Sequence, residues 1–261
     1  MNLLVFFLGF VVFTYRFFWR VNGAKQGESP GHEFIAHRGY QAMAPENTMA
    51  AYLGAEADGF RWIELDVACT KDGQVYCTHN LDLEMETDLF GYIFDLNSDE
   101  LNNAFTGIRM QSNHISHRVP SLDYVLSNLS TNVSVNIEIK YKNTFDLSTA
   151  RALRSLLIKH HRRNIIISSF NPVVLGYVKL FYGSAPIGFL VESKKYLWVI
   201  NWLQPEFIHP RADMLNKSFF EMCKQRNLKI LTWTVNNKVA LDWCIKNNIH
   251  GIITDERSFL N

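Results

Sequence analysis

The chain has 261 residues, of which 48% are hydrophobic and 20% are charged. This length and hydrophobic content are enough for one globular domain with a sizeable core, and they exclude a disordered chain. The net charge of +1 provides no long-range attraction for a polyanion, and no basic stripe is interleaved with aromatic residues, so nothing supports nucleic-acid binding.

The N-terminus differs in composition from the rest of the chain. Residues 3–15 are nearly unbroken apolar sequence, and counting through Val21 reaches the roughly 20 residues that span a bilayer, with Arg16 as an internal charge. We predict a membrane anchor, in the form of a transmembrane helix, in residues 1–21. Basic residues on its C-terminal side place the following domain in the cytoplasm. The alternatives are a signal peptide in residues 1–24, which implies a periplasmic or secreted protein, and a buried core helix.

A linker at 22–31 precedes a domain at 32–261, in which strand-like and helix-like segments alternate. We predict strands at 34–37, 62–67, 74–78, 133–140, 165–170, 187–191, 207–209, 229–233 and 251–254. We predict helices at 45–58, 120–129, 147–161, 172–181, 195–202, 217–226 and 238–247. Residues 80–118 show no sustained periodicity, and we interpret them as an insertion of loops and a short helix.

Apart from the short segment at 74–78, eight strands alternate with helices, which predicts a parallel sheet. Eight is the number that closes a (β/α)8 barrel of the TIM type, so we predict this α/β fold, with a small insertion after the second strand and a hydrophobic segment at the N-terminus. An open doubly wound sheet is the alternative. No GxGxxG follows the first strand, so its dinucleotide-binding form has no support. A barrel places functional residues together at the C-terminal ends of its strands.

Two carboxylates lie one residue apart in the second predicted strand. Glu64 and Asp66 project from one face, because side chains alternate along a strand. Two such charges repel by roughly 4 kcal/mol at an effective dielectric constant near 20, and a divalent cation is the simplest compensation. Glu138 lies in another strand, and the three acids form an all-oxygen set that suits Mg²⁺ or Ca²⁺ better than zinc. The alternative for Glu64 and Asp66 is an edge strand whose acids face water.

The four cysteines form neither a CxxC pair nor the density of a disulfide scaffold. We predict that all four are reduced thiols, which agrees with a cytoplasmic domain. They are Cys69, Cys77, Cys223 and Cys244.

Ten short motifs together resemble those of the glycerophosphodiester phosphodiesterase family, in the family's order and over residues 34–255. They are HRG at 37–39, PENT at 45–48, IELDV at 63–67, KDG at 71–73, His79, VPSLDYVL at 119–126, IEIK at 137–140, SSF at 168–170, TWTVN at 232–236 and ITD at 253–255. Each motif is weak by itself, whereas the ordered set is specific.

The resemblance implies a metal-dependent hydrolase that converts glycerophosphodiesters to glycerol 3-phosphate and an alcohol. It implies Glu64, Asp66 and Glu138 as the metal ligands. It also implies His37 and His79 as the acid and base pair, without saying which is which.

Four more residues are candidates for binding the substrate. Arg38 is suited to bind phosphate with two parallel donors and Lys140 as a point charge, although Lys140 is also a candidate partner for Glu138. Asn47 matches a site position of the family, or it belongs to the first turn of a helix. Trp233 either forms a wall of the pocket or caps the barrel core.

The chain departs from the family pattern just after His79. Asn80 stands where the family usually has aspartate, and Met85-Glu86-Thr87 stands where it has Arg-Thr-Thr. An asparagine offers no charge to orient His79 or to shift its pKa.

Two other functions remain open on the sequence. One is a lipid-directed phosphodiesterase of the lysophospholipase D type, whose insertion forms an apolar rim from residues 89–94 beside the membrane. The other is a catalytically silent, membrane-anchored barrel that binds phosphate esters. The expected partners are therefore a phosphodiester or lipid-derived substrate and a membrane.

Overall fold

The computed structural model describes residues 2–21, 32–42, 44–107, 117–161, 164–183 and 185–260. Within these ranges the centre of the molecule is a barrel of eight parallel strands: β1 (Glu33–Ala36), β2 (Trp62–Cys69), β6 (Ser134–Ile139), β7 (Ile165–Ser169), β8 (Ile187–Val191), β9 (Phe207–Pro210), β10 (Lys229–Thr232) and β11 (Gly251–Thr254). Neighbouring strands pair in the order β1, β11, β10, β9, β8, β7, β6, β2, and β2 pairs again with β1. The sheet therefore closes, and the predicted barrel is confirmed.

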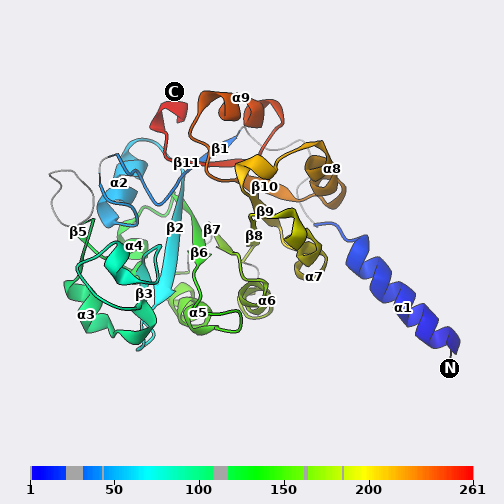
Figure 1. The fold of residues 1–261 in the computed structure, drawn as a ribbon, viewed down its shortest axis with the longest axis horizontal. Coiled ribbons are helices and arrows are strands. Elements are labelled where there is room, and N and C mark those ends of the chain that lie inside the picture. Colours follow the sequence, from blue (N-terminus) through cyan, green and yellow to red (C-terminus); the bar gives the residue numbers. More distant parts are fainter. Residues whose placement is uncertain are drawn as a thin grey trace.

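Helices surround the barrel (Figure 1). They are α2 (Met49–Ala57), α4 (Leu122–Asn128), α5 (Ser148–His160), α6 (Pro172–Phe181), α7 (Ile200–Leu203), α8 (Lys217–Arg226) and α9 (Lys238–Lys246). Polar side chains fix where several of them begin: Thr48 accepts from the backbone N–H of Ala51, and Asn216 accepts from that of Phe219. After β11 only a 3₁₀ turn, Arg257–Leu260, stands in place of an eighth helix.

The predicted strands differ from the observed ones by no more than two residues at either end. Fully buried strands such as β7 and β11 are rich in isoleucine, as expected for a parallel sheet that is covered on one face by helices and filled on the other by barrel side chains. All four cysteines are buried free thiols, as predicted.

The insertion forms a small unit beside β2. It follows β3 (Val75–Cys77), which runs antiparallel to β2. It contains the helix α3 (Ser98–Asn103), the short strands β4 (Phe105–Thr106) and β5 (His117–Arg118), and 3₁₀ turns at Leu83–Met85 and Ile93–Asp95. Leu83, Ile93 and Leu101 are fully buried in its own apolar cluster. Packing between these turns, rather than a local periodicity, orders this segment.

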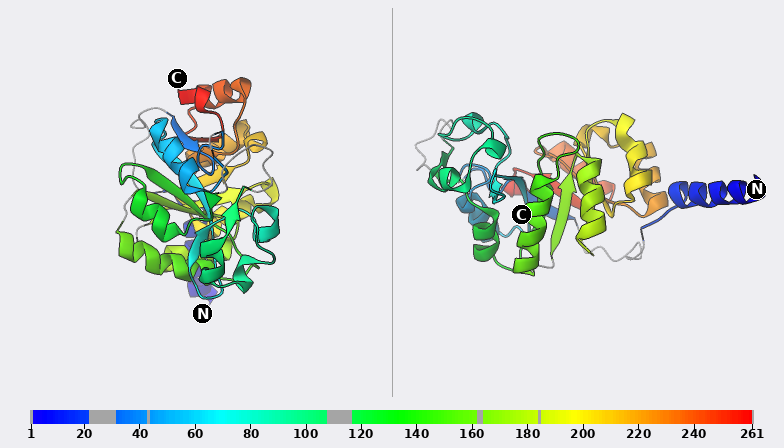
Figure 2. Two further views of the ribbon diagram at one scale, coloured as in Figure 1. Left: turned by 90° about the vertical axis from the view of Figure 1, so that its left-hand side faces the viewer. Right: turned by 90° about the horizontal axis from the view of Figure 1, so that it is seen from below.

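The N-terminal segment forms the helix α1 (Asn2–Phe17), which extends away from the barrel (Figures 1 and 2). It has 16 residues, and no helix in the described part of the chain is long and apolar enough to cross a membrane, so the predicted transmembrane helix is not found. The side chains from Val5 to Phe13 are exposed, so α1 is not the buried core helix that was the alternative. The predicted linker at 22–31 lies outside the described residues.

The base of α1 is attached to α7. The Arg16 guanidinium lies 4.5 Å from the centre of the Trp202 ring and donates to the Trp202 carbonyl at 3.0 Å. Trp19 is buried and its indole N–H donates to the Asn201 side chain at 3.3 Å. These contacts fix where the apolar helix leaves the domain.

Candidate active site

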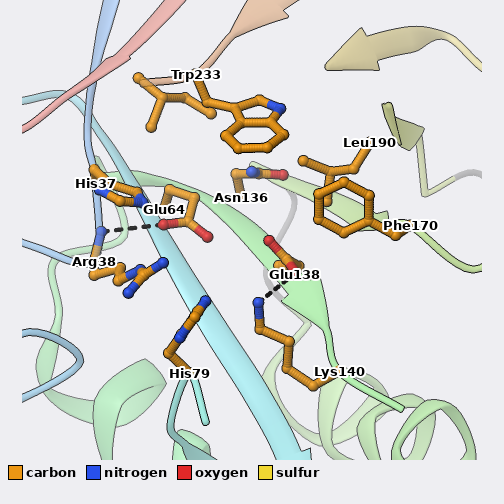
Figure 3. A pocket seen from close by; sticks show the side chains of 11 residues that line it. His37, Arg38, Glu64, His79, Asn136, Glu138, Lys140, Phe170, Leu190 and Trp233 are labelled. Atoms are coloured by element: carbon orange, nitrogen blue, oxygen red, sulfur yellow. Dashed lines mark hydrogen bonds and ion pairs between the residues drawn. The ribbon is translucent and has the colours of Figure 1, made fainter. Parts of the chain in front are cut away.

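One pocket lies at the mouth of the barrel, at the C-terminal ends of the strands (Figure 3). Seven of the nine predicted site residues line it, and the other two, Asp66 and Asn47, lie beneath its wall. The lining consists of His37, Arg38, Glu64, His79, Asn136, Glu138, Lys140, Phe170, Leu190, Trp233 and Ile253. Sequence segments 200 residues apart thus meet in one cavity because the sheet closes.

The three predicted metal ligands are gathered in this mouth. Carboxylate oxygens of Glu64, Asp66 and Glu138 lie within 4.8 Å of one another, and all three residues are buried. The register of β2 and β6 pairs Asp66 with Glu138 and Glu64 with Asn136, so the acids occupy one face of two adjacent strands. Hard divalent cations prefer such an all-oxygen set, and the residues present fit one.

Burial and mutual repulsion make this cluster of acids electrostatically costly. The pKa of Glu64 is well above its ordinary value because of burial and of the charges on Asp66 and Glu138. Burial likewise raises the pKa of Glu138. Burial would also raise the pKa of Asp66, but Lys140 and Arg38 outweigh it and lower that pKa. Three acids face two cations, which leaves one negative charge, and a divalent cation would neutralise it and leave one positive charge for a phosphate oxygen.

Both cations are ion-paired within the site. Lys140 Nζ lies 2.9 Å from Asp66 and 2.5 Å from Glu138, so the pairing with Glu138 considered from the sequence is present. Arg38 Nε lies 3.2 Å from Asp66, and its Nη1 lies 2.8 Å from Glu46. Both residues also line the pocket, where their remaining donors are available to an anion.

The structure places Asn47 behind Asp66 rather than on the pocket wall. Its side-chain amide donates to Asp66 Oδ2 at 3.0 Å, and its Oδ1 accepts from the Asp66 backbone at 3.1 Å and from the Tyr52 hydroxyl at 2.9 Å. Asn47 is only 2% exposed and precedes α2, with a φ of 55°. It therefore orients a carboxylate and does not line the pocket, and because α2 begins at Met49 it does not occupy the first helical turn that was the alternative.

His37 has a partner that the sequence reasoning did not assign. Its Nδ1 lies 2.8 Å from Oδ1 of Asp255, which also accepts from the side chain of Gln41 at 3.0 Å. Burial would raise the pKa of Asp255, but the hydrogen bond and charge of His37 outweigh it and lower that pKa. Asp255 follows β11, which pairs with β1, so the motif ITD could have indicated this contact once the barrel is assumed to close.

His79 follows β3 and is partly buried among charged and polar side chains. Burial, opposed by the charge of Asp66, lowers the pKa of His79 to about 4, so its ring is neutral at pH 7. A nitrogen of His79 and carboxylate oxygens of Glu46 and Glu86 lie within 4.8 Å of one another. Arg38 pairs with Glu46, and Glu86 accepts from the Asn80 backbone N–H and the Thr78 hydroxyl, so these acids are held by hydrogen bonds and an ion pair rather than by a second cation.

The side of the pocket opposite the carboxylates is apolar. The rings of Trp233 and Phe170 meet edge to face with centres 5.6 Å apart, and the Trp233 indole donates to the His209 carbonyl at 2.8 Å. Leu190 completes this wall (Figure 3). Trp233 therefore belongs to the pocket and packs against its neighbours as well. At the pocket's base, Oδ1 of Asn136 is buried and has no partner among the described residues.

Comparison with known proteins agrees with this arrangement. The model of the glycerophosphoryl diester phosphodiesterase family matches residues 37–257. A glycerophosphodiester phosphodiesterase of Caldanaerobacter subterraneus subsp. tengcongensis is 31% identical over 229 residues, which are 85% of this chain and 93% of that protein.

Solved structures are similar as well. A phosphodiesterase of Oleispira antarctica in complex with the product sn-glycerol-3-phosphate matches with a TM-score of 0.77 at 23% identity, over 85% of this chain and 92% of that one. A glycerophosphodiester phosphodiesterase of Thermotoga maritima matches with a TM-score of 0.70 at 27% identity, over 88% and 96%.

Proposed function

Because this chain belongs to the glycerophosphoryl diester phosphodiesterase family, we propose that it hydrolyses a glycerophosphodiester to glycerol 3-phosphate and an alcohol. The observation that carries the proposal is the joint presence, in one barrel mouth, of three buried carboxylates, two cationic side chains and two histidines. A barrel that bound phosphate esters without hydrolysing them would not need three buried carboxylates, whose burial and mutual repulsion are electrostatically unfavourable.

The carboxylates of Glu64, Asp66 and Glu138 would hold Mg²⁺ or Ca²⁺. Such a cation supplies positive charge that neutralises a phosphoryl oxygen as the reaction proceeds. Arg38 and Lys140 bind the remaining phosphate oxygens, and the apolar wall beside Trp233 contacts the apolar or headgroup portion of the substrate.

The contact with Asp255 supports His37 as the base. Its carboxylate accepts from Nδ1 of His37, which leaves Nε2 as an acceptor that can take a proton from the attacking hydroxyl or water. His79 then gives a proton to the leaving oxygen. Its ring is neutral in the free protein, and the negative charge of a bound phosphodiester favours its protonated form.

A substrate panel tests this function. The full chain is incubated with glycerophosphocholine, glycerophosphoethanolamine and lysophosphatidylcholine, each with Mg²⁺, Ca²⁺ or Mn²⁺. Lysophosphatidate formed from the third compound is measured, and so is glycerol 3-phosphate. We expect its release from the first two compounds, loss of release on chelation, and recovery when the cation is restored. Faster turnover of the lysolipid would favour a lipid-directed enzyme, and no turnover with any cation would favour the silent barrel.

We also propose that residues 1–21 attach the domain to a lipid bilayer, with the barrel on the cytoplasmic side. The apolar side chains along α1 are exposed, and Arg16 at the base of the helix lies over the exposed ring of Trp202. A second exposed tryptophan, Trp198, lies in the 3₁₀ turn that precedes α7. Tryptophan and arginine beside an apolar helix are typical of the interface between lipid and water.

Vesicle flotation tests the attachment. We expect the full chain to float with vesicles of phosphatidylcholine and phosphatidylglycerol, and the double variant Trp198→Ala, Trp202→Ala to float less. The control is Trp243→Ala, which removes a partly exposed tryptophan from α9. Full chain that stays in the soluble fraction would contradict the attachment without bearing on the hydrolysis.

A further inference from the structure

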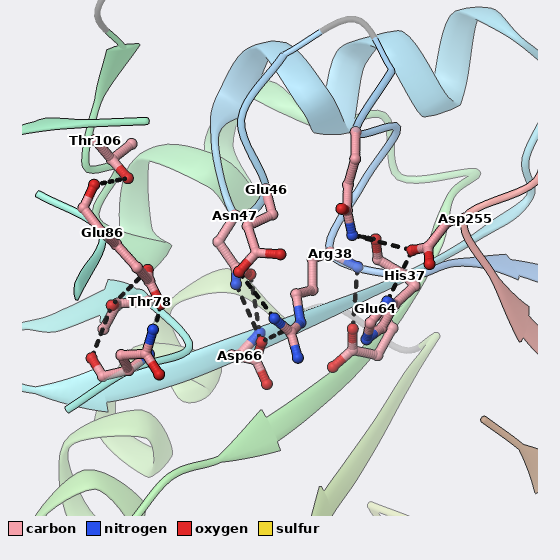
Figure 4. A network of polar contacts seen from close by, with 12 residues as sticks. His37, Arg38, Glu46, Asn47, Glu64, Asp66, Thr78, Glu86, Thr106 and Asp255 are labelled. Atoms are coloured by element: carbon pink, nitrogen blue, oxygen red, sulfur yellow. Dashed lines mark hydrogen bonds and ion pairs between the residues drawn. The ribbon is translucent and has the colours of Figure 1, made fainter. Parts of the chain in front are cut away.

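Glu86 lies outside the pocket lining but binds both chain neighbours of His79. Its Oε1 accepts from the backbone N–H of Asn80 at 2.7 Å, and its Oε2 accepts from the hydroxyl of Thr78 at 3.2 Å (Figure 4). A single carboxylate thus holds the backbone of the residue after the imidazole and the side chain of the residue before it. Hydrogen bonds to a charged acceptor are stronger than those between neutral groups, so this clamp is well suited to hold a side chain in one position.

The insertion in turn fixes Glu86. The backbone carbonyl of Glu86 accepts from the N–H of Gly107 at 3.0 Å and from the hydroxyl of Thr106 at 3.2 Å. The next residue, Thr87, is buried and forms an isolated bridge with Thr106. These contacts fix Glu86 within the folded insertion, and Glu86 in turn contacts the segment that holds His79.

Glu86 also contributes charge near the ring. One of its oxygens lies within 4.8 Å of a ring nitrogen of His79 and of a Glu46 oxygen. Glu46 is neutralised by Arg38 at 2.8 Å, whereas Glu86 forms no ion pair with any residue that the structure describes. Asn80 hydrogen-bonds the ring but is uncharged. Glu86 is therefore the nearby carboxylate that remains free to favour a protonated His79.

We propose that Glu86 is the positioning residue of His79. It holds both chain neighbours of the imidazole, through the Asn80 backbone N–H and the Thr78 hydroxyl, and provides the negative charge that Asn80 lacks. This inference rests on the proposed function, in which His79 gives a proton to the leaving oxygen.

Two substitutions separate the clamp from the charge. Glu86→Ala removes both, and we expect kcat for a glycerophosphodiester to fall ~10- to 100-fold with KM nearly unchanged, as when a partner that orients a reacting group is removed. Glu86→Gln keeps an acceptor for Asn80 and loses the charge, so its loss of kcat should be smaller. The control is Glu84→Ala, in the adjacent 3₁₀ turn, whose side chain makes neither contact and should leave kcat unchanged.

Moving the charge tests its contribution directly. Adding Asn80→Asp to Glu86→Gln returns a carboxylate to the ring, and we expect kcat to rise above that of Glu86→Gln alone. Asn80→Asp by itself puts two carboxylates beside one ring and should not raise kcat above that of the unmodified chain. Glu86→Ala with unchanged kcat would overturn the clamp, and a double variant no better than Glu86→Gln would overturn the charge.

Crystal structures of the unmodified chain and of Glu86→Ala give a readout that does not depend on turnover. We expect the His79 ring to leave its position in the variant, and an unmoved ring would contradict the inference. An unmodified chain without turnover on any substrate would reject the proposed function, while the position of the ring would still decide the role of Glu86.

Discussion

The double variant Glu64→Ala, Asp66→Ala is expected to lose metal-dependent turnover by ~1,000-fold or more, since a bound cation stabilises the transition state by several kcal/mol. It removes two of the three buried carboxylates that lie within 4.8 Å of one another. Hydrolysis of glycerophosphocholine at saturating Mg²⁺ or Ca²⁺ measures the loss. The control is Glu221→Ala, which removes an exposed acid from α8. Full metal-dependent turnover in the double variant would refute the role of the carboxylates.

The same site predicts how stability changes with pH and metal. Because the folded protein holds the pKa of Glu64 above its unfolded value, ionisation of Glu64 lowers the stability of the metal-free protein as the pH rises above about 4.5. Glu64→Gln should therefore melt at a higher temperature than the unmodified chain at pH 8 without metal. It should also gain less from added cation, because one ligand is lost. Thermal melts of both proteins with and without metal check the expected rise in melting temperature and the smaller gain from added cation.

The second large effect concerns the two histidines. We expect His37→Ala and His79→Ala each to lower kcat by ~10²- to 10⁴-fold, the usual contribution of a positioned acid or base. The leaving group separates their roles. A p-nitrophenyl ester of glycerol phosphate needs no protonation as it leaves, so His79→Ala should recover most of its activity on that substrate and His37→Ala should not. The control is His161→Asn, which changes an exposed histidine after α5.

Asp255→Asn tests whether the carboxylate that binds His37 contributes to catalysis. It keeps the shape of the residue that binds His37 but removes the charge that stabilises the imidazolium. We expect it to resemble His37→Ala, with a smaller loss of kcat on both substrates. If His37→Ala, rather than His79→Ala, recovered activity on the p-nitrophenyl ester, His37 would be the acid and His79 the base.

The barrel could be predicted because its signals are local. Runs such as residues 165–169 and 251–254 are apolar and β-branched, and helical segments that begin after Thr48 or Asn216 separate such runs. The alternation of side chains along one strand also places Glu64 and Asp66 on the same face without any tertiary knowledge. The predicted transmembrane helix is not found among the described residues, since counting apolar residues through Val21 does not show that the helix ends at Phe17.

The sequence by itself determined the number of barrel strands, the paired acids and the order of the motifs, because each depends on residues close together in the chain. Only the tertiary structure decided which side chains touch. Asp255 reaches His37 across 218 positions because the barrel closes, Asn47 turns behind Asp66, and the folded insertion brings Glu86 to both neighbours of His79. Such contacts depend on loop paths and strand register, which no local pattern encodes.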